Sequence, residues 1–79
     1  MKKVEFKYSP ICEDNSEMVV VDGRPVGTFF TVEEGWDCYY YEGMISREDF
    51  EKRKSTRHFS WGELDYDVAK DKLRKLLQK

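Results

Sequence analysis

The side chains that could carry out nucleophilic, acid–base or metal chemistry are few and widely spaced. His58 is the only histidine, and the two cysteines are Cys12 and Cys38. Structural zinc sites use closely spaced ligand pairs and four ligands, and this chain offers neither. No serine or cysteine stands at a spacing that marks a nucleophile activated by His58. We therefore expect no catalytic residue, no metal site and no cofactor, so the protein is not expected to be an enzyme.

Composition indicates one small folded domain over residues 1–79. Charged residues make up 38% of the 79 residues and aromatic residues 15%. Disordered chains are rich in charge but poor in aromatic side chains, so this combination favours a folded domain with a well-solvated exterior. Met1 is followed by Lys2 and Lys3 and not by an apolar run. The sequence thus predicts a cytoplasmic protein without a membrane span, in which a Cys12–Cys38 disulfide is allowed but not required.

Charge is segregated along the chain although the net charge is only −2. Residues 10–45 carry eight acidic side chains and one basic side chain, Arg24, whereas both flanking segments are mildly basic. The adjacent acids Glu33 and Glu34 precede Gly35, so we expect them to be solvated in a turn. An acidic middle segment argues against a broad nucleic-acid footprint and for charge pairing within the protein or with a partner.

Four segments have the alternation or the β-branched content of strands. Residues 4–8 alternate apolar and charged side chains, and residues 18–21 form a short run that ends at the turn signal Asp22-Gly23. We expect Arg24 and Pro25 to extend that turn to about four residues. Further strands are predicted over 26–32 and 36–41, joined by a turn at 33–35. The order predicts an antiparallel meander of three to five strands in an α+β fold.

One clear amphipathic helix follows, with apolar residues spaced along one face. Its start is expected between residues 60 and 66, because Ser60 with Glu63 fits a capping box and Asp65 is a second candidate N-cap. Its apolar face consists of Tyr66, Ala69, Leu73, Leu76 and Leu77. We expect this helix to cover one face of the sheet. Between sheet and helix, residues 44–61 allow either a short helix at 47–54 followed by a strand at 57–61, or one long hairpin.

Apolar and aromatic residues occur at both even and odd positions of the strands over 18–41. Both faces of the sheet are therefore expected to be hydrophobic, and only one helix is predicted to cover them. The expected core beneath the helix consists of Val26, Phe30, Val32, Trp36 and Tyr40. The opposite face is expected to carry Phe29, Tyr39 and Tyr41, ringed by the acids Glu33, Asp37 and Glu42. Aromatic residues are enriched at the centres of protein interfaces. These six residues are therefore the predicted partner-binding site.

The sequence predicts a small non-catalytic module that binds a protein partner, or a second copy of itself, through this aromatic face. The acidic residues around it favour a basic partner surface. Compact charged chains of this size also occur among the inhibitors and adaptors of phage and mobile elements, an association by size alone. The alternative is a nucleic-acid-binding regulator that uses bases of the 47–58 segment and of the C-terminal helix, namely Arg47, Arg53, Arg57, Lys70 and Arg74.

Overall fold

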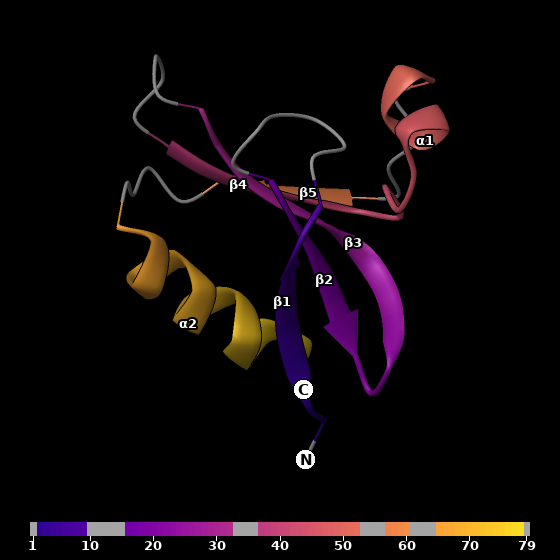
Figure 1. Cartoon of the computed structure of the whole chain (residues 1–79). Helices are drawn as coiled ribbons and strands as arrows, with labels where there is room; N and C mark the ends of the chain where they lie inside the picture. The colour runs from indigo at the N-terminus through magenta and orange to yellow at the C-terminus, as the bar shows by residue number, and fades with distance from the viewer. Residues whose placement is uncertain (1, 10–15, 33–36, 53–56, 61–64, 79) are drawn as a thin grey trace.

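A computed structural model of the chain describes residues 2–9, 16–32, 37–52, 57–60 and 65–78, with the backbone alone for Val32, Asp37 and Arg57. It contains an antiparallel five-stranded meander with the strand order β1-β2-β3-β4-β5, followed by a helix (Figure 1). This confirms the predicted α+β class. The strands are β1 (Val4–Tyr8), β2 (Glu17–Val21), β3 (Arg24–Val32), β4 (Asp37–Glu42) and β5 (Arg57–Ser60), and the helices are α1 (Arg47–Glu51) and α2 (Tyr66–Leu77).

The β2–β3 turn is tighter than the sequence suggested. Val21 pairs directly with Arg24, so the loop contains only Asp22 and Gly23, whose φ angles are 50° and 82°. Positive φ at both positions is the requirement of a type I′ turn, which matches the twist of the flanking strands. Arg24 and Pro25 therefore belong to β3 and do not extend the turn. The register of β2 against β3 shifts between Val19, which pairs with Gly27, and Val20, which pairs with Pro25. Val26 is thus the extra residue of a β-bulge in β3, and Pro25 is tolerated beside it.

The segment before α2 resolves into a short helix and a strand, the first of the two alternatives. Ser46 caps α1, with its side-chain oxygen accepting from the backbone N–H of Asp49 at 3.2 Å. β5 then pairs with β4 along its whole length. Asp65 caps α2 by accepting from the N–H groups of Asp67 and Val68. Among the described residues no helix is long and apolar enough to cross a membrane.

The β3–β4 register decides which residues lie beneath α2. Phe29 pairs with Tyr40 and Phe30 pairs with Tyr39, and the connection between the strands, 33–36, is four residues long. The turn predicted from the sequence, 33–35, has three residues, and a change of one residue in the connection reverses which parity of β3 shares a face with which parity of β4. The prediction was therefore wrong for Phe29, which is fully buried beneath α2, and for Phe30, which lies on the opposite face.

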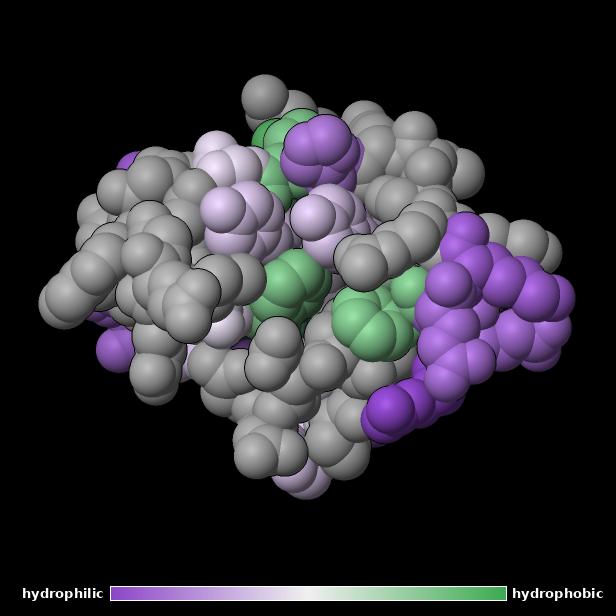
Figure 2. All heavy atoms as spheres, turned by 90° about the horizontal axis from the view of Figure 1, so that it is seen from above, coloured by the Kyte–Doolittle hydropathy of each residue, from purple (hydrophilic) through white to green (hydrophobic). Residues whose placement is uncertain are grey.

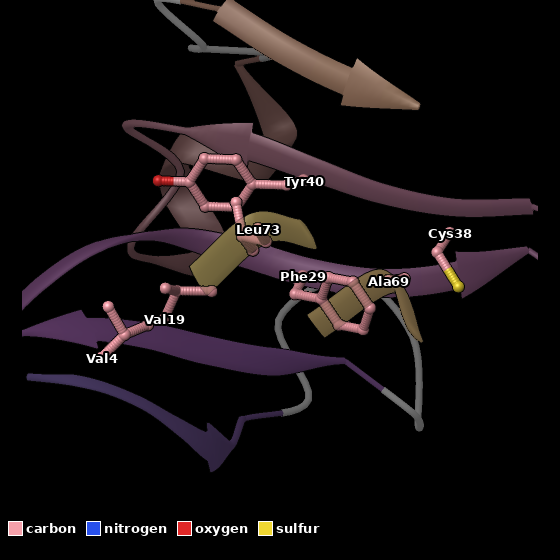
Figure 3. Packing of buried hydrophobic residues seen from close by; sticks show 7 residues of the cluster. All are labelled: Val4, Val19, Phe29, Cys38, Tyr40, Ala69 and Leu73. Atoms are coloured by element: carbon pink, nitrogen blue, oxygen red, sulfur yellow. The ribbon is translucent and has the colours of Figure 1, made fainter. Parts of the chain in front are cut away.

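The core lies between the sheet and α2. Its buried members come from β1 to β4 and from α2, and Figure 3 shows them gathered in the space between these elements. Tyr40 belongs to this cluster and Val26 packs against it, as predicted, whereas Trp36 and the side chain of Val32 lie outside the described residues. The seven members are Val4, Val19, Phe29, Cys38, Tyr40, Ala69 and Leu73.

Gly27 is required by the close approach of Tyr40. A Cβ atom at position 27 would lie 2.5 Å from the carbonyl oxygen of Tyr41 and 2.6 Å from Cε1 of Tyr40. We expect Gly27→Ala to lower the free energy of unfolding by about 1 to 3 kcal/mol, because backbone or a core ring must move. Urea denaturation measures the change. Gly23→Asn is the control, since Gly23 has open space around it and asparagine tolerates positive φ.

Leu73 is fully buried at the centre of the α2 face. Leu73→Ala should lower the free energy of unfolding by about 2 to 5 kcal/mol through lost burial and the cavity that remains. Val68, which is 39% exposed on the same helix, provides the matched control Val68→Ala. Equal effects of the two substitutions in a denaturation experiment would contradict the placement of α2.

Candidate protein-binding face

The sheet face opposite α2, here called the outer face, carries a row of four rings contributed by β3, β4 and β5. Cross-strand pairing puts Phe30 opposite Tyr39 and puts Tyr41 opposite His58. We call Phe30, Tyr39, Tyr41 and His58 the aromatic ladder. Strand alternation places all four side chains on the same side of the sheet.

The rings of the aromatic ladder contact one another in sequence. The Phe30 and Tyr39 centroids are 5.7 Å apart with an interplanar angle of 22°, and Phe30 lies 5.3 Å from Tyr41. Tyr41 meets His58 edge to face at 5.5 Å. Such contacts hold each ring in one orientation, so the ladder is a preorganised surface.

Exposure is uneven along the ladder. Phe30 retains only 7% exposure and forms its floor, Tyr39 and Tyr41 are half-buried, and His58 is exposed. Viewed from above, hydrophobic and weakly polar residues meet near the middle of the visible surface, beside the strongly hydrophilic residues of α1 (Figure 2). The accessible part of the ladder is therefore formed by the two tyrosines and the histidine.

The chain between β4 and α1 covers part of the outer face, which was not predicted from the sequence. The Thr28 hydroxyl donates to the carbonyl oxygen of Met44 at 2.6 Å, and Met44 is only 2% exposed. The neighbouring Ile45 remains 43% exposed, and its N–H donates to Asp49. The segment at Met44 is thus a small covering element of the outer face, and it reduces the surface available to a partner.

The predicted ring of acids is not assembled around the aromatic ladder by the described residues. Glu42 shares its strand parity with Cys38 and Tyr40, so it belongs to the α2 side of the sheet and its prediction was wrong. Glu33 and the side chain of Asp37 lie outside the described residues. The preference for a basic partner therefore stays a prediction from the sequence.

The candidate chemical residues are separated by the sheet. Cys38 is fully buried on the α2 side, with its Sγ 3.5 Å from Thr31 Oγ1, whereas His58 is exposed on the outer face. Cys12 lies outside the described residues. Within the described part of the chain no three His, Cys, Asp or Glu side chains group in a way that could hold a metal ion.

The bases of the nucleic-acid alternative lie on opposite sides of the sheet. Arg47 is on α1, next to the outer face, and pairs with Glu51 at 3.7 Å. Lys70 and Arg74 are on α2, beyond the other face (Figure 1). Arg53 and the Arg57 side chain are outside the described residues.

Tyr39 and Tyr41 of the ladder were predicted from the sequence, whereas Phe30 and His58 were not. A signal for Phe30 was present in the length of the β3–β4 connection, since counting four residues would have placed Phe30 with Tyr39. His58 required the knowledge that β5 pairs with β4. No protein-family model, no curated protein and no solved structure matches this chain.

A pair of substitutions separates the two faces by stability. Phe29→Ala should lower the free energy of unfolding by about 3 to 5 kcal/mol, because the ring is fully buried against Phe6 and Tyr66. Tyr39→Ala removes the ring contact with Phe30 across the strands and the contact with Tyr41 along β4, and at this half-buried position it should cost about 1 kcal/mol or less. Chemical denaturation of both variants checks the difference, and the reverse order would show that the faces are exchanged.

Proposed function

We propose that the protein is a non-catalytic module that binds a protein partner through the accessible part of the aromatic ladder, formed by Tyr39, Tyr41 and His58. The observation that carries this proposal is a fixed row of rings on the sheet face that α2 does not cover. Tyrosine is enriched at interface hot spots because it offers a large contact area together with a hydroxyl. A cytoplasmic setting belongs to the proposal as a prediction from the sequence.

Ring contacts also stabilise a sheet, so a purely structural role competes with this proposal. Cross-strand pairs contribute about 0.2 to 1 kcal/mol each. In a purely structural role, the buried Phe30 would account for most of the stabilisation of the sheet. Substituting the exposed His58 would then have little effect. Binding instead requires the exposed members of the ladder, so it is these residues that the experiment must change.

The nucleic-acid alternative has less support. Lys70 already pairs with Glu17 at 2.7 Å, and Arg74 pairs with Asp71 at 3.1 Å. Both cations also lie over the Phe6 ring, at 5.1 and 5.2 Å from its centroid. The contacts with Glu17 and Phe6 hold α2 on the sheet, and the Asp71 pair compensates Arg74 within the helix, so both cations are poorly placed to neutralise phosphates.

The test is affinity capture from native cytosol with the wild-type protein, Tyr39→Ser and Val68→Ser, with both proteins and nucleic acids identified. We expect a protein that is retained by the wild type and by Val68→Ser, which changes an exposed residue of α2, and that is lost with Tyr39→Ser. Far-UV circular dichroism verifies that each variant is folded.

Two results would contradict the proposal. Identical sets of captured proteins from all three baits would show that the ladder is not the binding surface. Capture of nucleic acid by all three baits, lost on substituting Arg47 or Lys70, would instead favour the regulator.

A further inference from the structure

β1 is an edge strand of the sheet that the described residues form, where it pairs with β2 alone. An edge strand presents backbone donors and acceptors that can pair with another strand. The side chains at the C-terminal end of β1 are accessible: Lys7 is exposed and Tyr8 is 69% exposed. This edge is remote from the aromatic ladder, which lies on β3 to β5.

The hydrogen bonds at the two ends of β1 show which of its backbone groups point outward. Ser9 N donates to Ser16 O, and Asp22 N donates to Lys3 O. In an antiparallel pair, bonded and non-bonded positions alternate, so the odd-numbered residues of β1 bond to β2. The N–H and C=O groups of Val4, Phe6 and Tyr8 therefore point away from the sheet.

The contact made by Gln78 supports this orientation. Lys2, the next even-numbered residue toward the N-terminus, has a carbonyl oxygen that accepts from the Gln78 side-chain amide at 3.1 Å. The Gln78 side chain, just after α2, thus occupies the outward-facing carbonyl of Lys2. The outward-facing groups that stay available for pairing with another strand are those of β1 itself.

One antiparallel register pairs the whole of β1 with a second copy of itself. With Phe6 opposite the partner's Phe6, Val4 stands opposite Tyr8, and these even-numbered positions exchange the outward hydrogen bonds. Glu5 then stands opposite Lys7, twice in each dimer. Residues at such non-bonded positions have Cα atoms only about 4.5 Å apart, so both pairs are attractive contacts between opposite charges.

The neighbouring registers are less favourable. Centring on Glu5 brings two glutamates together and puts Lys3 against Lys7. Centring on Lys7 brings two lysines together. Centring on Val4 gives an attractive contact between Lys3 and Glu5, but it requires the carbonyl of Lys2, which is already bound.

We infer that β1 pairs antiparallel with β1 of a second copy, with Phe6 at the centre, to form a symmetric dimer. The two five-stranded sheets then join into one continuous sheet. The twofold axis stands perpendicular to the sheet, so both α2 helices lie on one face and both aromatic ladders on the other. The two cations of α2 that contact Phe6 of β1, Lys70 and Arg74, are each paired within their own subunit, with Glu17 and Asp71. These two cations are therefore already compensated next to the edge strand.

A second copy is a better occupant of this edge than an unrelated strand, because the order Lys3, Glu5, Lys7 complements itself in the antiparallel sense. With Phe6 at the centre it does so without using the carbonyl of Lys2, which is already bound. Association would also stabilise the folded state of so small a domain, which buries only a modest fraction of its surface on folding. This inference does not rest on the proposed function, since it uses a different surface.

The test is sedimentation velocity of the purified full chain over a range of concentrations at low salt. We expect the wild type to dimerise, and Glu5→Lys or Lys7→Glu alone to weaken dimerisation about tenfold, since each creates two like-charge pairs. The double variant carrying both substitutions restores opposite charges across the interface and should dimerise as the wild type does. Rising salt should reduce these differences.

A second comparison tests the backbone pairing. Tyr8→Pro removes one outward N–H without touching the bonds to β2, and it should weaken dimerisation, whereas Tyr8→Ala keeps that N–H and should weaken it less. A wild-type monomer at high micromolar concentration overturns the inference, as does a double variant no better than the single ones. Dimerisation lost with Tyr39→Ser but retained by Glu5→Lys would assign the dimer to the outer face instead.

Discussion

The register between β3 and β4 is the constraint on which the rest of this structure depends. It places Phe29 beside Tyr40, and it lays the Tyr40 ring over Gly27, where no larger residue fits. α2 then packs Ala69 and Leu73 onto this surface. Shifting the register by one residue would exchange every side chain of β4 between the two faces.

α2 is held by polar contacts as well as by its apolar face. Lys70 bridges Glu17 of β2 and the rings of Phe6 and Tyr66, and the two side chains of the ion pair are only 21% and 25% exposed. Partial burial strengthens the attraction but also raises the cost of desolvation, so the pair contributes orientation more than stability. The pair fixes which turn of α2 faces β1 and directs the Lys70 side chain toward the sheet.

With one face covered, the molecule has two other surfaces of consequence. The outer face offers an ordered row of rings, partly covered by the segment before α1, and the β1 edge offers backbone groups with self-complementary charges. β2 lies between them, and the edge pairs in the plane of the sheet whereas the rings project from its face, so each can be occupied without obstructing the other. A β1-paired dimer would present two aromatic ladders on one side, an arrangement suited to a repeated or symmetric partner.

Local chemistry alone determined several elements: positive φ at Asp22-Gly23 for the hairpin, Asp65 and Ser46 as helix caps, and the spacing of Ala69 and Leu73. These depend on interactions within a few residues, which a sequence displays directly. The identity of the covered face did not follow, because it depends on the number of residues connecting β3 to β4, and one residue reverses it. The membership of His58 in the ladder, the cover supplied by Met44 and the outward groups of β1 were likewise decided only by tertiary structure, since each depends on which distant strand lies alongside.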